Sequence, residues 1–424
     1  MKQLVTNLLE LQAKRLLKKF KPKVVAVVGS VGKTSTKLNI ATVLSERYKV
    51  LAHYGSYNVP ASVPLSMFNL KAPANAKSPF AWIKILSQMQ KILSSDYSFD
   101  VLVLELGTDH PGEIAYFKRY LNPDVSVVTA VSPEHMAGFG TLDAVAKEEL
   151  AVTEYSKLTL INRDDIDGSF AKLIPDGTNL DTYGTSGVAE YRFETDEFVP
   201  GKGFTGKFIS PEFKELKVVL GVVGEHNVRT VVAAGTVGIK LGLSAEQVVD
   251  GMKKVKPVMG RMNLLKGLEN TTIIDDTYNS SPLAAVAALQ TLYQFQTPQR
   301  IAILGSMNEL GDYSKQAHEE VASACDPASL DWVVTIGQEA KTYMTPILQK
   351  KGCRVENFTS PYDAGNFVHK IMQPKAVILA KGSQNGVFAE EAVKMLLHST
   401  TEEEQLVRQD PDWMAIKQQQ FGEK

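Results

Sequence analysis

A glycine-rich hexapeptide close to the N-terminus has the residue types that phosphate binding requires. It reads GSVGKT over residues 29–34 and lies between a short apolar run at 24–28 and a stretch of helical character. Backbone N–H groups at a helix N-terminus can cradle phosphates, a lysine can neutralise their charge, and a threonine hydroxyl can bind Mg²⁺. The alternative is a chance glycine turn, but the flanking strand and helix favour a nucleoside triphosphate site. The residues that we expect to contact the nucleotide here are Gly29, Ser30, Gly32, Lys33, Thr34 and Ser35.

Two further side chains with metal-binding chemistry follow apolar runs. Glu105 comes directly after the run at 101–104, and His135 follows the run at 125–129 by a few residues. Ligands of open α/β sheets gather at the carboxyl ends of parallel strands, so both residues should lie beside the phosphate loop. A single acidic or imidazole side chain in a loop is often only solvated. Two of them at consecutive strand ends favour a site for a second divalent ion.

The elements that must position these residues form two α/β units, separated near residues 256–257. In the first unit, strands are expected at 24–28, 101–104, 125–129 and 158–161, and helices at 227–241 and 244–254, with Ser244 as an N-cap. Residues 180–222 are rich in Gly, Phe and Thr, and we expect them to form a small antiparallel addition. In the second unit, strands are expected at 272–274, 300–304, 332–336 and 376–379. The predicted fold is therefore α/β, with a P-loop ATPase-type parallel-sheet domain at 24–256 and a Rossmann-like domain at 257–424.

The two ends of the chain carry amphipathic or polar segments. Residues 4–20 have apolar side chains at helical spacing and a basic opposite face, which predicts an amphipathic helix within a segment 1–23. Such a helix could pack on the next domain, or it could attach loosely to an anionic membrane surface. The polar tail from residue 401 could be helical or partly frayed.

Composition excludes several classes of protein. The 424 residues include 46 Lys plus Arg and 47 Asp plus Glu, a balance that argues against a nucleic-acid-coating protein. Two cysteines, Cys325 and Cys353, cannot build a disulfide framework or a four-cysteine zinc site. Apolar runs are too short to span a bilayer, and the N-terminus lacks the core of a signal peptide. We therefore expect a soluble protein of the cytoplasm.

Several motifs, taken in order, resemble those of the Mur ligases. They cover residues 24–400 and are most similar to the MurF branch, whose members add D-alanyl-D-alanine to UDP-N-acetylmuramoyl-tripeptide in peptidoglycan synthesis. DDTYN and MNELGDYS are more specific to this branch than the phosphate loop. The motifs are GSVGKTST (29–36), ELGTDHPGEI (105–114), EHMAGFGTL (134–142), GEHNV (224–228), GRMN (260–263), DDTYNSSP (275–282), LGSMNELGDYSKQAH (304–318) and KGS (381–383).

The resemblance implies an ATP- and Mg²⁺-dependent ligase that forms an acyl phosphate, which an incoming amine then attacks. Cations must bring two anionic groups together, and Lys33, Arg261 and two Mg²⁺ ions are expected to supply the charge. By motif, the expected metal ligands are Thr34, Glu105 and His135. The expected nucleotide contacts are Asn227, Arg261, Asp276 and Asn279, and Lys381 is expected near the phosphates or the attacking amine. Taken singly, Asn227 could be a helix cap, Asp276 part of an acidic turn, and Lys381 a solvated charge. His318 could bind the incoming dipeptide or could be a surface residue.

The sequence departs from the MurF pattern in three places. Only residues 1–23 precede the first expected strand, so the domain that normally holds the uridine nucleotide is not expected. Glu149 stands where the family commonly has a carbamylated lysine; we favour Glu149 as a metal ligand and keep Lys147 as the alternative. The acceptor loop at 57–68 retains Asn58 but has Val59 where the family has a second Asn.

Two alternatives to a MurF-like activity stay open. One is a ligase for another acceptor, such as a peptide, a polyglutamate or another cell-wall precursor. The other is a non-catalytic ATP-binding partner of cell-wall enzymes, against which the intact Lys33, Thr34, Glu105, His135 and Arg261 argue. In either case we expect small-molecule or peptide substrates, and association with other cell-wall enzymes could accompany them.

Overall fold

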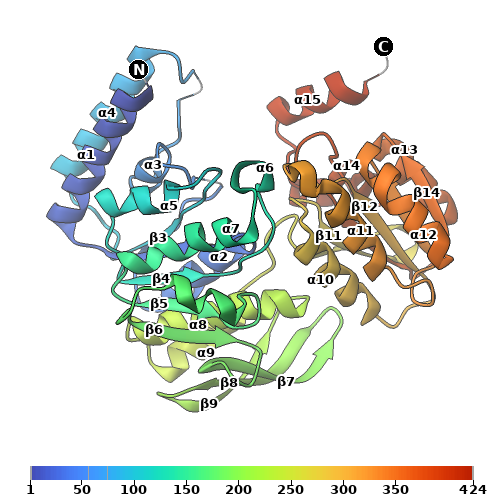
Figure 1. Cartoon of the computed structure of the whole chain (residues 1–424), viewed down its shortest axis with the longest axis horizontal. Coiled ribbons are helices and arrows are strands. Elements are labelled where there is room, and N and C mark those ends of the chain that lie inside the picture. Colours follow the sequence, from blue (N-terminus) through green and yellow to red (C-terminus); the bar gives the residue numbers. More distant parts are fainter. Residues whose placement is uncertain (1, 56, 74, 423–424) are drawn as a thin grey trace.

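The computed structural model describes residues 2–55, 57–73 and 75–422, which fold into two α/β units (Figure 1). The first unit contains a sheet with the strand order β2-β3-β1-β4-β5-β6-β7-β8-β9. Adjacent strands are parallel from β2 to β7, and only β7, β8 and β9 pair antiparallel. The bounds are β1 Lys23–Val28, β2 Val50–Leu51, β3 Val101–Glu105, β4 Val125–Val128, β5 Thr159–Asn162, β6 Leu180–Gly184, β7 Tyr191–Val199, β8 Gly203–Ser210 and β9 Lys214–Leu220.

The region 180–222 differs from its expectation. It continues the first sheet, and β6 pairs parallel with β5, so the prediction of an antiparallel addition holds only for β7 to β9. Short apolar runs indicate strands but not their direction, because direction is set by the path that the chain takes between them.

Helices cover both faces of the first sheet. Side chains of β1 therefore point alternately into two apolar cores, one on each face. Val25 and Val27 pack with helices α2, α8 and α9, whereas Val24, Ala26 and Val28 pack with α1, α3, α4, α5 and α7. Burial on both faces explains the continuous apolar run of this strand. The bounds are α1 Lys2–Phe20, α2 Lys33–Leu44, α3 Val63–Met67, α4 Pro79–Ser94, α5 Glu113–Tyr116, α6 Met136–Phe139, α7 Leu142–Leu150, α8 Glu225–Lys240 and α9 Ala245–Lys254. A capping box at Ser244 and Gln247 begins α9, as predicted.

The second unit has a sheet with the strand order β10-β11-β15-β12-β13-β14, in which only β10 is antiparallel to its neighbour. Helices α10, α11 and α12 cover one face, and α13 and α14 cover the other. This arrangement confirms the Rossmann-like prediction. The bounds are β10 Asn263–Lys266, β11 Thr272–Asp276, α10 Pro282–Tyr293, β12 Arg300–Gly305, α11 Ser314–Ala324, β13 Trp332–Ile336, α12 Thr345–Lys351, β14 Val355–Phe358, α13 Pro361–Ile371, β15 Val377–Lys381, α14 Glu390–Lys394 and α15 Pro411–Phe421.

The terminal segments are both helical. Helix α1 packs on the first unit through Leu9, Ala13 and Leu16, which are fully buried. Helix α15 returns to the second unit, where Lys417 is buried against α14. None of the helices in the described part of the chain combines the length and apolar character needed to cross a bilayer.

Candidate active site

The phosphate loop is shaped by the close approach of two strand ends. Strand β1 ends at Val28, and α2 begins at Lys33 with Gly32 in the left-handed conformation as its N-cap (φ 86°). A Cβ at Gly29 (φ 124°) would lie 2.2 Å from the hydroxyl of Thr129, so only glycine fits there. The loop thus delivers the N-terminus of a helix to the carboxyl edge of a parallel sheet, where phosphates are commonly bound.

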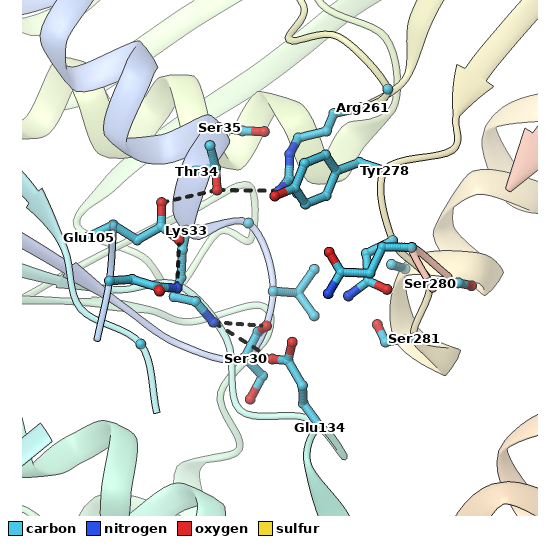
Figure 2. A pocket seen from close by; sticks show the side chains of 18 of the residues that line it. Ser30, Lys33, Thr34, Ser35, Glu105, Glu134, Arg261, Tyr278, Ser280 and Ser281 are labelled. Carbon is cyan, nitrogen blue, oxygen red and sulfur yellow. Dashed lines mark hydrogen bonds and ion pairs between the residues drawn. The ribbon is translucent and has the colours of Figure 1, made fainter. Parts of the chain in front are cut away.

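Lys33 faces a cavity of about 350 Å³ that lies between the two units. Its Nζ donates to the carbonyl of Gly29 at 2.5 Å. Figure 2 shows its contact with a carboxylate oxygen of Glu134, which lies 3.7 Å away. Burial alone would lower the pKa of Lys33, but the carboxylates of Glu134, Glu149 and Glu105 outweigh it and raise the pKa. The side chain is therefore a cation at neutral pH.

Thr34 and Glu105 form a pair of oxygen ligands beside this lysine. Strand β3 pairs with β1 so that Glu105 is the partner of Val27, and the Thr34 hydroxyl donates to Glu105 Oε2 at 3.0 Å. Burial pushes the pKa of Glu105 upward, but nearby Lys37 and Lys33 hold it below its ordinary value, so Glu105 is a carboxylate. A hydroxyl and a carboxylate are ligands that Mg²⁺ accepts when phosphates and water complete its shell. The residues present therefore fit the ion.

Lys37 is a neighbour of Glu105 that the sequence analysis did not single out. Its Nζ lies 3.1 Å from Glu105 Oε2 and donates to the carbonyl of Gly55 at 3.0 Å, and its side chain is 3% exposed. It stands one helical turn after Lys33, and this spacing is the signal that could have identified it. Asn58 reaches the other oxygen of Glu105 at 3.3 Å.

His135 lies among carboxylates of both units. Its Nε2 lies 3.6 Å from Asp109 and 3.8 Å from Glu134, and its Nδ1 lies 3.2 Å from Glu309, which belongs to the second unit. Within the described residues, no three His, Cys, Asp or Glu side chains are grouped closely enough to hold a metal ion by themselves. The role of His135 as a ligand of a second ion stays a prediction.

Glu149 lies behind the phosphate loop and does not line the cavity. It is 2% exposed, and its Oε2 accepts the backbone N–H of Gly29 at 2.7 Å. Burial raises the pKa of Glu149 to about 7, although Lys33 opposes the effect. Lys147 is exposed on the same helix. Of the two candidates that the sequence offered, Glu149 is thus the one that touches the phosphate loop.

The second unit contributes cations and amide groups to the opposite wall. Arg261 Nη2 donates to the Thr34 hydroxyl at 3.3 Å, and its guanidinium stacks on Tyr278 at 4.2 Å from the ring centroid. Arg261 Nε is buried without a hydrogen-bond partner among the described residues, which leaves a donor for an anionic ligand. Tyr278, Ser280 and Ser281 line the cavity on the side opposite the phosphate loop (Figure 2).

Lys381 and Asp276 end two neighbouring strands of the second sheet. Strands β11 and β15 pair with Asp276 opposite Lys381, and the two side chains form a buried ion pair of 2.6 Å. Lys381 also donates to the carbonyl of Asn279 at 3.0 Å, so it is not the solvated charge that was its alternative. His226 lines the same cavity. Burial lowers the pKa of His226 to about 3, and the positive charges of Lys381 and Arg229 act in the same direction, so the imidazole is neutral.

The cavity brings together most of the residues that the sequence predicted. Asn227 lines it from the first turn of α8, while its amide donates to the carbonyl of Val223 at 2.9 Å. Gly29, Glu149 and His318 do not line it. The predicted residues that do are Ser30, Gly32, Lys33, Thr34, Ser35, Asn58, Glu105, His135, Asn227, Arg261, Asp276, Asn279 and Lys381.

The structure corrects the expectation for His318. The side chain is fully buried in α11, its Nε2 accepts the N–H of Met307 at 2.9 Å, and its Nδ1 lies 2.8 Å from the carbonyl of Ser314. Both ring nitrogens are thus engaged within the protein. His318 supports the segment that follows β12, and it is neither an exposed residue nor a substrate contact.

A helix-borne phosphate loop with a lysine, facing basic residues of a second α/β unit, defines a nucleotide-dependent enzyme whose site lies between two domains. Comparison with known families agrees with this class. The Mur ligase middle domain matches residues 27–238, and the Mur ligase glutamate ligase domain matches residues 260–384. The chain belongs to the Mur ligase family, and it is an ATP- and Mg²⁺-dependent enzyme that forms an amide bond.

Individual relatives and solved structures point the same way. The chain is 28% identical to the UDP-N-acetylmuramoyl-tripeptide–D-alanyl-D-alanine ligase of Bacillus subtilis, over 91% of this chain and 78% of the relative. The chain is 27% identical to the enzyme of the same name from Haemophilus influenzae, over 88% of this chain and 76% of the relative. The solved structure of MurF ligase from Thermotoga maritima in complex with ADP superimposes on this chain with a TM-score of 0.76 and is 25% identical to it. The superposition covers 94% of this chain and 84% of the Thermotoga maritima chain.

Proposed function

We propose that the chain joins D-alanyl-D-alanine to the terminal carboxylate of UDP-N-acetylmuramoyl-tripeptide, with hydrolysis of ATP to ADP and phosphate. One observation carries the proposal: Lys33, Thr34 and Glu105 of the first unit meet Arg261 and Lys381 of the second around a single cavity. The names of the relatives support the choice of acceptor and amine. The alternative is a different acceptor for the same amide-forming reaction.

In this proposal, the cations of the cavity bring two anionic groups together. Lys33 and the free Nε of Arg261 stabilise the γ-phosphate as the acceptor carboxylate approaches it, and the acyl phosphate forms as ADP leaves. The amine then attacks the acyl carbon and phosphate is expelled. Bound Mg²⁺ would be held by Thr34 and Glu105 and would add positive charge at the phosphates. His135 is proposed for a second ion, and Glu149, which lies behind the loop, would join it by exchanging its hydrogen bond to Gly29 for the metal.

The remaining residues are proposed to bind and orient the reactants. Asn227, Asp276 and Asn279 contact the nucleotide, and Lys381, held in place by Asp276, lies near the phosphates or the amine. Asn58 is proposed to contact the acceptor. The hydrogen bond between Arg261 and Thr34 joins the two walls, and closure of the walls around the reactants would keep water away from the acyl phosphate.

The proposal includes an arrangement and a location. We divide the chain into an N-terminal helix at 1–23, an ATP-binding domain at 24–256 and a C-terminal domain at 257–424, and we place the enzyme in the cytoplasm. The acceptor is proposed to be held by the walls of the cavity and by the segment 57–68.

The test is product formation with a defined acceptor. Phosphate and ADP release would be measured with ATP, Mg²⁺ and D-alanyl-D-alanine, with and without UDP-N-acetylmuramoyl-tripeptide, and the product would be weighed by mass spectrometry. We expect acceptor-dependent release and the pentapeptide, both lost in Lys33→Ala. If ATP binds but no muramoyl acceptor stimulates release, the assigned acceptor is wrong.

A further inference from the structure

Helices α1 and α4 form a pair at the edge of the molecule, and we define this pair by residues 2–20 and 79–94. The two helices lie side by side and project from the first unit (Figure 1). Arg15 meets Gln90 at 3.0 Å and Lys19 meets the carbonyl of Leu93 at 2.6 Å, so the helices run parallel and both begin at the projecting end. None of the residues that line the cavity belongs to the pair. The active site therefore does not account for it.

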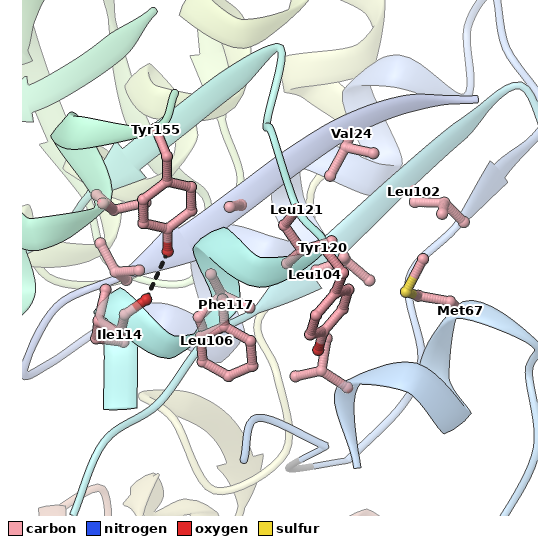
Figure 3. Close-up of a cluster of buried hydrophobic side chains, with 14 of the residues drawn as sticks. Val24, Met67, Leu102, Leu104, Leu106, Ile114, Phe117, Tyr120, Leu121 and Tyr155 are labelled. Carbon is pink, nitrogen blue, oxygen red and sulfur yellow. Dashed lines mark hydrogen bonds between the residues drawn. The ribbon is translucent and has the colours of Figure 1, made fainter. Parts of the chain in front are cut away.

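The inner face of the pair is buried against the first unit. Leu9, Leu16, Ile85 and Met89 belong to the same apolar cluster as Met67 and the neighbouring buried residues shown in Figure 3. The acidic residue of α1, Glu10, is 2% exposed and is engaged by Tyr116 and by Arg119. The orientation of the outer face is thus set by packing.

We call the exposed side chains of the pair its outer face, and near the projecting end these side chains are apolar. Leu4, Leu8 and Leu11 of α1 are 64%, 36% and 50% exposed, and Phe80 and Ile83 of α4 are 83% and 61% exposed. These five make up half of the ten large hydrophobic side chains exposed in the described chain. Isolated exposed apolar residues need no explanation, but their concentration on one projecting element indicates a contact surface.

The same face becomes basic toward the body of the protein. In α1, Leu4, Leu8, Leu11, Arg15 and Lys18 recur at intervals of three or four residues and so form one stripe along the helix. Lys14 and Lys91 are exposed beside it. Glu10 is the one acidic residue in the two helices and it is buried, so the outer face carries positive charge without compensation.

We propose that this outer face binds the surface of an anionic lipid bilayer, with Leu4, Phe80 and Ile83 inserted among the headgroups and the basic stripe against the lipid phosphates. An apolar end bordered by lysine and arginine is the pattern of helices that lie in a membrane interface. A second copy of the chain is disfavoured as the occupant, because two uncompensated basic faces repel one another. The contact is peripheral and reversible, and it leaves the active site facing the aqueous phase.

The test uses the full-length protein and sedimentation with vesicles. Vesicles of phosphatidylglycerol and phosphatidylcholine in equal amounts should bind the protein, and pure phosphatidylcholine should bind it at least tenfold more weakly, because each basic residue near an anionic surface contributes about fivefold. Raising the salt concentration should release it. Phe80→Ser/Ile83→Ser and Lys14→Glu/Lys18→Glu should each reduce partitioning at least tenfold.

Matched control variants distinguish binding through this surface from nonspecific binding of the protein to vesicles. Val188 and Val219 are 72% and 47% exposed elsewhere in the first unit, and Lys315 has a side chain 67% exposed on α11. Val188→Ser/Val219→Ser and Lys315→Glu should leave partitioning unchanged, and thermal unfolding would verify that every variant is folded. Equal binding to both vesicle types, or equal loss in the controls, overturns the proposal. A concentration-dependent dimer without vesicle binding, abolished by Phe80→Ser/Ile83→Ser, would assign the face to a second copy and would also overturn it.

Discussion

Removal of one buried charge should detach the C-terminal helix from the body of the enzyme. Lys417 of α15 is fully buried, and its Nζ contacts Glu391 at 2.6 Å, Glu390 at 2.9 Å and the carbonyl of Arg408 at 2.7 Å. The substitution Lys417→Met keeps most of the side-chain volume but removes the ammonium group. The two carboxylates would then share a single cation, Arg408, which already binds Glu390 at 2.7 Å.

The size of the effect follows from the burial of these groups. Breaking a buried ion pair by removal of one partner costs about 3–5 kcal/mol, because the remaining charge stays buried without compensation. A loss of about 3 kcal/mol raises the fraction of molecules with α15 detached by roughly 150-fold. Lys394 supplies the matched control, since its 2.8 Å pair with Glu403 joins side chains that are 27% and 31% exposed. Lys394→Met should cost at most about 1 kcal/mol.

Hydrogen exchange of residues 411–421, followed by mass spectrometry, measures this opening directly. We expect protection of α15 to fall at least 100-fold in Lys417→Met, which corresponds to about 2.8 kcal/mol, and by less than about fivefold in Lys394→Met. Adding Glu391→Gln to Lys417→Met should restore part of the loss, because it removes the uncompensated charge. If the two single variants exchange at the same rate, the buried cluster does not hold the helix and the reasoning is refuted.

Detachment of α15 should also weaken nucleotide binding in the active site. Arg408, whose carbonyl Lys417 holds, donates to the carbonyls of Thr277 at 2.6 Å and Tyr278 at 2.9 Å. Tyr278 is in turn the ring on which Arg261 stacks. We therefore expect Lys417→Met to raise the KM for ATP more than it lowers kcat, because the nucleotide-facing segment loosens while Lys33 remains in place.

Four further predictions concern the site and its surroundings. Lys33→Ala should reduce acceptor-dependent phosphate release by at least about 100-fold, because the phosphates lose their nearest cation; undiminished release would contradict the assigned site. Arg261→Lys, which loses the free Nε and the stacking on Tyr278, should lower kcat/KM for ATP about tenfold, and an unchanged value would show that the guanidinium geometry is not used. Glu149→Ala should impair turnover more than Lys147→Ala, because Glu149 is buried against Gly29 and Lys147 is exposed; loss in Lys147→Ala with rescue by short carboxylic acids would reverse the assignment. Burial raises the pKa of Asp275 to about 6, against roughly 4 in an unfolded chain, so its contribution to stability is complete below pH 4 and is lost as the pH rises through 6. The free energy of unfolding of Asp275→Asn, measured by denaturant titration, should therefore rise relative to the parent by about 2 kcal/mol between pH 4 and pH 7, and a constant difference would show that Asp275 is not the titrating group.

The sequence by itself determined the local parts of the enzyme. The phosphate loop with Lys33 and Thr34, the placement of Glu105 at a strand end, and the capping box at Ser244 were all predicted, because each depends on residues a few positions apart. The two α/β units followed from the alternation of apolar runs with helical segments. The ordered motifs further indicated the family, which the domain matches confirm.

Tertiary structure alone decided which distant groups meet. The local sequence did not show that both ring nitrogens of His318 bind other groups of the protein. Nor did it show that Lys381 forms an ion pair with Asp276 instead of facing solvent. The polar tail gave no sign that Lys417 would be buried with two glutamates of α14. The physical reason is common to these cases: torsions and helix faces are set by neighbouring residues, whereas strand direction, register and the pairing of buried charges depend on how the whole chain crosses the sheets.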